Sequence, residues 1–339
     1  MKIKRHITLI AMSAALINIQ AQDVLLSGPM RAPMFVDPAL AGTFHDRQIV
    51  LVHRQQRAAG NDPFITQGIS ADFCLDRPKP GEDPRKGRAG VGIAFLNDRS
   101  ASPAFRTTEF QASLAYRLSI DGYSSIAAGL QAGLRQHSLA APDGRWASQY
   151  NGQYYDASLS TGESFDRGTR TRPDVGAGVA YSFRLRQDRR GSGELAFKTG
   201  IAVFHAARPD LSLIEGSGGQ VERRYSGFFE GTVGLGRSKL QLRPSAFLNM
   251  QGGTLRSLGG IMMEKVFGGR GEFLAPEHSP SLGLGAYIRD GRSVVAAIEF
   301  GWAHYSVGMS YDMNVIAVEH GAPMNAFEIG LCYRVAGEE

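Results

Sequence analysis

The chain has 339 residues, a formal net charge of +5, 42 glycines, 18 phenylalanines, 11 tyrosines and 43% hydrophobic residues. Its basic residues are scattered, and the basic run 184–190 contains no aromatic side chain on which a base would stack, so nucleic-acid binding is not indicated. The length would accommodate two soluble domains, but no linker or domain-sized repeat divides the chain, which predicts one domain.

The N-terminus has the three parts of a secretory signal peptide. Lys2, Lys4 and Arg5 form a basic region, residues 7–19 are uncharged, and Ile19-Gln20-Ala21 is a suitable cleavage site. The uncharged stretch is too short to span a bilayer as a permanent helix. We therefore predict a signal peptide at 1–21, followed by an N-terminal periplasmic or plug segment at 22–46.

Period-two alternation dominates the rest of the chain, where no run approaches the about 18 apolar residues of a membrane-spanning helix. In 108–119, Phe110 and Leu114 share one face, and Gln111 and Ser113 share the other. Alternation over about ten residues suits a tilted strand with lipid on one side and water on the other. A soluble β-sandwich also alternates, but its strands are shorter. The same pattern recurs in 126–135, 174–185, 304–314 and 325–335.

These segments predict an all-β protein: a transmembrane outer-membrane β-barrel over 47–335 with about fourteen antiparallel strands. An even number of strands places both ends of the barrel in the periplasm. Long outer connections are then expected at 137–172, 207–222 and 315–324. The expected strands are 47–56, 64–75, 88–97, 106–118, 123–136, 173–185, 194–206, 223–235, 238–250, 254–266, 281–289, 293–301, 304–314 and 325–335.

Several strings resemble the PorP/SprF family of type IX secretion membrane proteins, and their order and spacing make the likeness specific. Segment 34–42, Met-Phe-Val-Asp-Pro-Ala-Leu-Ala-Gly, is similar to the Asn-Pro-Ala-Tyr-Ala-Gly segment of the family. The chain departs from the family at Asp37, where asparagine is usual, and at Gln56, where tryptophan is frequent. The other similar strings are 92–98, 115–118, 284–291, 308–315 and 326–333.

The resemblance implies a role that alternation does not show. It implies an outer-membrane barrel that assists type IX secretion and contacts periplasmic ring lipoproteins or a peptidoglycan-binding lipoprotein. It also implies a secreted partner, an adhesin with a C-terminal sorting domain, and a place among Bacteroidota, often in gliding motility. The alternative function is a passive outer-membrane diffusion channel, because a fold does not decide a function.

One constellation invites an enzymatic interpretation. His304 and Ser306 lie on the same face of a strand, as a base and a nucleophile would, with Asp312 or Asn314 as an orienting group. Strand parity places the pair on the lumen face, so we interpret it as polar lumen lining. We expect no enzyme activity, and no cofactor or metal site is predicted.

Other polar and aromatic residues concern structure and partners. Cys74 and Cys332 have no metal-binding or CxxC spacing, and their redox state stays open. Partner contact is predicted in the outer connection 137–172, which contains several aromatic residues among polar ones. These aromatic residues are Tyr150, Tyr154, Tyr155 and Phe165. The charged residues expected to face the lumen are Glu109, Arg117, Arg135, Arg184, Arg289, Glu299, Glu328 and Arg334.

Overall fold

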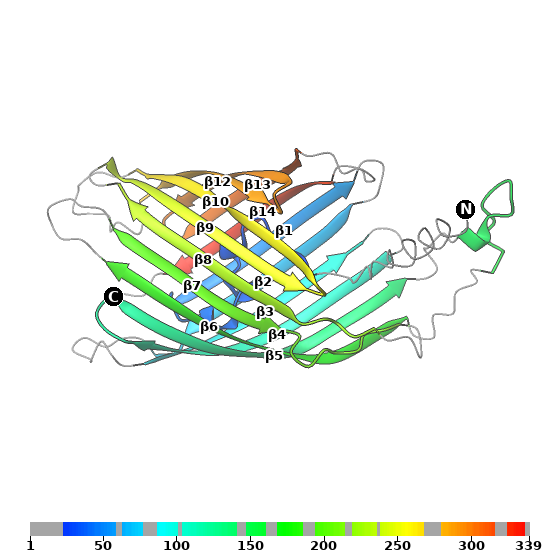
Figure 1. Ribbon diagram of the computed structural model, residues 1–339, viewed down its shortest axis with the longest axis horizontal. Helices are drawn as coiled ribbons and strands as arrows, with labels where there is room; N and C mark the ends of the chain where they lie inside the picture. Colours follow the sequence, from blue (N-terminus) through cyan, green and yellow to red (C-terminus); the bar gives the residue numbers. More distant parts are fainter. Residues whose placement is uncertain are drawn as a thin grey trace, which may run out of the picture.

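The computed structural model describes residues 23–58, 63–76, 87–100, 104–140, 147–160, 168–185, 194–213, 219–235, 238–267, 279–315 and 324–335. In this part of the chain, fourteen antiparallel strands form one closed barrel (Figure 1). The pairing of the first strand with the last, which includes Arg47 with Val335, closes the sheet. The predicted all-β barrel is confirmed, whereas the predicted signal peptide lies outside the described residues.

Each strand pairs with its neighbours in sequence, so no strand crosses over another. Within the described residues, no helix is long and apolar enough to cross a membrane. The strands are β1 (Arg47–Ala58), β2 (Phe64–Cys74), β3 (Arg88–Arg99), β4 (Ala104–Ser119), β5 (Ser124–Ala140), β6 (Thr169–Leu185), β7 (Leu195–Phe204), β8 (Arg224–Gly234), β9 (Leu240–Gln251), β10 (Thr254–Val266), β11 (Ser281–Arg289), β12 (Ser293–Trp302), β13 (Tyr305–Asn314) and β14 (Met324–Val335).

The predicted strand bounds are wrong mainly at the end of the barrel where β5 ends and β6 begins. β5 continues to Ala140 and β6 begins at Thr169, so the connection between them is shorter than the predicted 137–172. The added residues pair in a regular ladder, for example His137 with Arg170. The added outward residues Ser138, Thr169 and Thr171 are polar, so the apolar alternation stops while the hydrogen-bonded ladder continues. β7 ends at Phe204, two residues early, because His205 has a positive φ of 56°.

We call the barrel end that carries Arg47 and Val335 the periplasmic end, following the predicted orientation, and the opposite end the outer end. The described part of the predicted outer connection 207–222 packs against the barrel instead of extending from it. Arg170 of β6 donates to the Asp210 carboxylate over 2.9 Å, and Leu211 is buried. The residues described on either side of 214–218 therefore offer little free surface to a partner.

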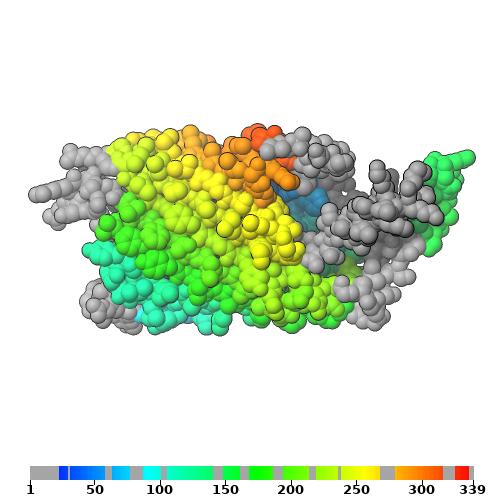
Figure 2. All heavy atoms as spheres, viewed as in Figure 1, coloured from blue at the N-terminus to red at the C-terminus, as the bar shows by residue number. Residues whose placement is uncertain are grey.

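The two faces of the wall follow the predicted parity. Outward side chains such as Leu114 and Leu130 are exposed, whereas Gln111 and Gln131 point inward and are buried. Figure 2 shows the outside of the middle strands as a continuous wall of side chains. An apolar exterior around a polar interior is the arrangement that a barrel in a bilayer requires.

This parity predicts different tolerance to charge on the two faces. Leu130→Arg is expected to lower the free energy of unfolding by about 2–4 kcal/mol, because the cation would lie among lipid tails. Thr232→Arg, which faces a cavity at the periplasmic end, is expected to cost less. Ser113 also faces inward but is only 5% exposed, so it leaves no room for arginine and is a poor control. Urea unfolding in lipid vesicles measures both values, and equal losses would contradict the assignment of faces.

Candidate functional site

The interior of the barrel contains the segment that precedes β1. Residues 23–46, here called the luminal segment, run from the outer end, where Asp23 donates its backbone N–H to Gln251, to the periplasmic end, where Gly42 lies against Phe73. Met34 and Ala39, midway along it, are fully buried. Figure 1 shows this dark-blue segment within the ring of strands.

Prolines determine the local shape of the luminal segment. It forms three short 3-10 turns, η1 (Pro29–Arg31), η2 (Pro33–Phe35) and η3 (Pro38–Leu40), each opened by a proline. Proline suits the first position of a turn, where its missing N–H has no partner to lose and its φ is already set. The result is a compact strap that does not add a strand to the barrel.

Inward-facing glycines make room for this strap. A Cβ atom at Gly129 of β5 would overlap the backbone of Pro38 and Ala39, and one at Gly178 of β6 would overlap the Asp37 carboxylate. At Gly90 of β3, a Cβ atom would overlap the backbone carbonyl of Ala41. The wall thus lacks side chains where the luminal segment approaches it most closely.

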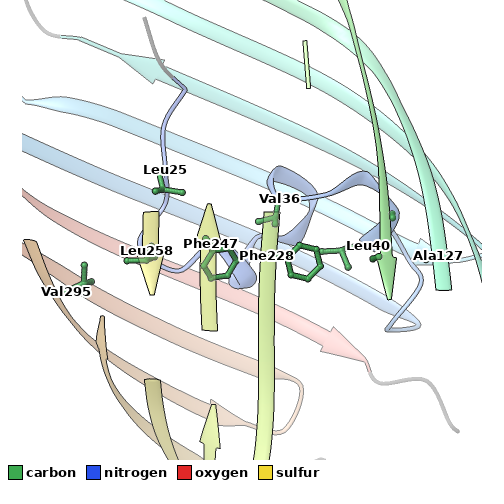
Figure 3. Packing of buried hydrophobic residues seen from close by; sticks show 10 residues of the cluster. Leu25, Val36, Leu40, Ala127, Phe228, Phe247, Leu258 and Val295 are labelled. Atoms are coloured by element: carbon green, nitrogen blue, oxygen red, sulfur yellow. The ribbon is translucent and has the colours of Figure 1, made fainter. Parts of the chain in front are cut away.

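Apolar side chains also attach the luminal segment to the wall. Leu25, Val36 and Leu40 belong to one buried cluster with wall residues of several strands (Figure 3). Burying a large apolar side chain contributes about 1.5–3 kcal/mol. The wall residues labelled in this view are Ala127, Phe228, Phe247, Leu258 and Val295.

A buried set of charges, here called the middle ion cluster, holds the luminal segment at Ser27. It consists of Arg54 (β1), Arg289 (β11), Asp312 (β13) and Glu328 (β14). Arg54 lies 3.2 Å from Asp312 and 3.4 Å from Glu328, and Arg289 lies 2.9 Å from Asp312. Glu328 accepts the backbone N–H of Ser27 over 2.6 Å. The strap and four strands therefore share one network.

A second buried set, the outer ion cluster, surrounds Asp23. The Asp23 carboxylate lies 2.7 Å from Arg135, 2.7 Å from the His205 ring and 3.3 Å from Arg224. The other ring nitrogen of His205 lies 2.5 Å from Asp174. Burial opposes a charge on His205, but Asp23 and Asp174 outweigh it and raise the pKa of His205 to about 9. A charged His205 thus ties the start of the luminal segment to the outer end.

At the periplasmic end the lumen is open and forms a cavity of about 790 Å³, here called the cup. The luminal segment lies at its inner side with Ser27, Arg31 and Leu40, and residues of the turns 119–124 and 302–304 lie at its mouth. No residue of the described outer connections lines it. The luminal segment therefore separates the cup from the outer end.

Asp37, the residue that departs from the family pattern, predicts a pH dependence. Its Oδ1 accepts the N–H of Ala39 over 2.8 Å, whereas its buried Oδ2 has no partner among the described residues. Burial raises the pKa of Asp37 to about 8, although the Ala39 N–H opposes this.

The unfolded carboxyl ionises near pH 4 and the folded one near pH 8, so folding is progressively penalised as the pH rises between these values. We expect Asp37→Asn to stabilise the protein above pH 8, by at least about 1 kcal/mol. The gain should be smallest near pH 4. Urea unfolding at both pH values measures this, and a gain that does not depend on pH would contradict it.

The predicted partner-binding residues lie apart from the lumen. Tyr150, Tyr154 and Tyr155 belong to the fold-back 147–160, in which Tyr150 and Tyr155 form a bridge, and their exposures are 58%, 61% and 38%. Figure 1 shows this fold-back beyond the outer end of the barrel. Phe165 lies outside the described residues.

The residues of the enzymatic interpretation are not brought together. His304 and Ser306 line the mouth of the cup, whereas Asp312 belongs to the middle ion cluster, six residues along β13 from Ser306 and thus about 20 Å away. Among the described residues, no group of three or more His, Cys, Asp or Glu side chains is arranged to hold a metal ion. Cys74 and Cys332 are both free thiols.

Several of the charged residues predicted to face the lumen do form pairs, for example Glu109 with Arg135. Sequence reasoning missed Asp23 and Arg54, which complete the two ion clusters. For Arg54 a signal existed, because it lies on the inward face of β1 by the same alternation. For Asp23 no local signal existed, since no periodic pattern covers the luminal segment.

A sequence model described as "Type IX secretion system membrane protein PorP/SprF" matches residues 18–333, nearly the whole chain. The chain belongs to the PorP/SprF family. The expected family resemblance is thereby confirmed. Among curated proteins, no significant match is found.

Solved structures similar to this PorP/SprF protein include transporters and channels. The toluene transporter TbuX of Ralstonia pickettii has a TM-score of 0.48 and 10% identity, with 90% of this chain and 94% of that chain covered. The monoaromatic hydrocarbon channel CymD has a TM-score of 0.48 and 8% identity, with 94% and 95% covered. At such values the likeness carries no functional argument, and the fold rests on the strand pairing itself.

Proposed function

We propose that this barrel is an outer-membrane component of the type IX secretion system that assists the secretion or surface anchoring of a partner protein with a C-terminal sorting domain. Contact with periplasmic ring lipoproteins or a peptidoglycan-binding lipoprotein completes the proposal. The observation that carries it is the family match over residues 18–333. The luminal segment supports it, because a strap bound by two ion clusters is unsuited to passive diffusion.

The same observations argue against the two other functions. A diffusion channel needs a continuous water-filled path, and the luminal segment lies between the cup and the outer end. A hydrolase needs an oriented base, whereas Asp312 is bound to Arg54 and Arg289 far from His304. We therefore propose a non-enzymatic role.

Co-purification tests this function directly. The tagged protein is extracted from outer membranes, and its partners are identified by mass spectrometry. Type IX ring lipoproteins and a secreted protein with a sorting domain are expected. Recovery without type IX partners, combined with a large single-channel conductance in planar bilayers, would favour a diffusion channel instead.

The exposed tyrosines predict where a secreted partner binds. Replacing Tyr150, Tyr154 and Tyr155 by serine, or shortening 143–168 to a brief glycine-serine link, is expected to leave the barrel folded but to abolish surface display of one secreted adhesin. Aromatic side chains in an adaptable polar loop are typical anchors of a protein interface.

Surface labelling of intact cells measures display, and heat-modifiable migration in gels shows that the barrel is folded. Tyr225→Ser is the matched control, since this tyrosine is 48% exposed but lies on the outward face of β8. Normal display by the shortened variant would place recognition elsewhere, for instance in the periplasmic connections 76–87 and 267–280.

A further inference from the structure

The cup has an unequal distribution of charge. Among the described residues that line it, seven are cationic and five are acidic, so its net charge is +2. On the side formed by β14, β3 and β4, the three arginines Arg334, Arg88 and Arg117 face inward.

Two of these arginines lie directly opposite each other. Arg88 of β3 pairs with Arg117 of β4 in the ladder, an arrangement in which like charges repel. Among its contacts, Arg117 donates to the Ser125 hydroxyl over 2.7 Å and to the Thr43 carbonyl over 3.0 Å. These contacts fix the orientation of the Arg117 guanidinium at the cup.

The third arginine has unused donors. The guanidinium of Arg334 makes no hydrogen bond or ion pair with any described residue, and its Nε is shielded from solvent. The Arg88 guanidinium likewise makes no hydrogen bond or ion pair with any described residue. A guanidinium with unused donors is suited to bind a carboxylate, because hydrogen bonds between ionised groups are stronger than those between neutral groups.

The opposite side of the cup is internally paired. Arg243 lies 3.0 Å from Glu299, 3.2 Å from Glu264 and 3.5 Å from Glu230, and Lys198 lies 3.1 Å from Glu230. Three acidic and two cationic groups leave this side slightly negative. A field therefore crosses the cup from Arg88 and Arg334 toward the glutamates.

An aromatic ring lies between the two sides. Phe44 has Arg117 over its ring at 5.1 Å and Lys198 at 5.4 Å. Burial, followed by Arg334, Lys198, Arg184 and Arg117, holds the pKa of the neighbouring His45 well below its usual range. His45 therefore stays neutral and adds no charge of its own, while the cations around it make this part of the cup electropositive.

We propose that the cup binds an extended, carboxylate-bearing peptide segment of a periplasmic partner, with Arg88 and Arg334 donating hydrogen bonds to its carboxylates. This site deepens the proposed role in type IX secretion and rests on it for the nature of the partner. The segment enters from the periplasmic end, because the mouth lies there and the luminal segment blocks the other side.

The lining favours a peptide over a small anion. A compact dianion such as phosphate would gain from the arginines but would also face Glu230, Glu264 and Glu299 across the cavity. A chain with carboxylates on one side and apolar groups on the other avoids this repulsion. Its apolar groups contact aromatic lining residues such as Phe44, Tyr287 and Trp302.

The experiment measures the fluorescence anisotropy of labelled hexapeptides added to the purified full-length barrel in detergent. One peptide alternates glutamate and leucine, and the comparison peptide alternates glutamine and leucine. Only the glutamate peptide is expected to bind, and its affinity should fall as salt is added. Arg88→Gln and Arg334→Gln are each expected to weaken binding by about tenfold. Arg223→Gln, at the exposed outer rim, is the matched control and should change nothing.

Three results would overturn the proposal: equal binding of both peptides, unchanged affinity in both folded variants, or displacement of the glutamate peptide by inorganic phosphate at equal affinity. If a variant does not fold, the comparison of the two peptides on the unaltered protein still decides. Co-purification separates this site from the proposed function. If type IX partners co-purify but the glutamate peptide does not bind, the peptide site is refuted and the proposed function stands. If the peptide binds but no type IX partner co-purifies, the proposed function is refuted and the peptide site stands.

Discussion

Glu328→Ala is expected to lower the free energy of unfolding by about 3–5 kcal/mol, because it removes one partner from a buried ion network. The Glu328 side chain is 1% exposed and interacts with both Arg54 and Arg31. It also accepts the backbone N–H groups of Ser27 and Gly28 at 2.6 and 2.9 Å. Alanine would leave the Arg31 guanidinium and two N–H groups without their partner, and Arg54 with Asp312 as its remaining carboxylate.

Glu194→Gln is the control for this variant. Glu194 also faces an arginine, Arg184 at 3.8 Å, but both side chains are more than one third exposed. Exposed pairs contribute about 0–1 kcal/mol. Urea unfolding in lipid vesicles compares the two variants, with Glu328→Gln expected to fall between them. A loss below about 1 kcal/mol for Glu328→Ala would show that the middle ion cluster does not hold the luminal segment.

Gly129→Val is expected to open the barrel. The new side chain would occupy the place of the η3 backbone at Pro38 and Ala39, so this part of the luminal segment must move off the wall. Overpacking of this kind costs about 1–3 kcal/mol, which a large barrel tolerates. Single-channel conductance in planar bilayers is therefore expected to rise several-fold above that of the unaltered protein.

Gly227→Val tests whether any larger side chain has this effect. Gly227 faces outward from β8, and a Cβ atom there would meet only a backbone oxygen at 4.0 Å. Both substitutions replace a strand glycine by valine, so their local strand preference is the same. Unchanged conductance of folded Gly129→Val, or an equal rise in Gly227→Val, would show that η3 does not obstruct the lumen.

Alternation predicted the barrel and the face of most strand residues. Leu114 and Leu130 face outward and Gln111 and Gln131 inward, as the sequence indicates. The prediction failed at Thr169 and Thr171, which are outward in β6 but polar, because they lie beyond the apolar band while the ladder continues. Hydrogen bonding between strands needs no apolar side chain, so periodicity cannot detect that part of a strand.

The sequence by itself determined the fold class, the inward and outward faces and the family. A strand with lipid on one side and water on the other must alternate apolar and polar residues, and this period of two is visible in the sequence. Only the tertiary structure decided where the luminal segment lies and what holds it. Asp23 and Arg135 are 112 positions apart, and Ser27 and Glu328 are 301 apart. Such pairs leave no local pattern, since their contact depends on the closure of fourteen strands around glycine-lined space.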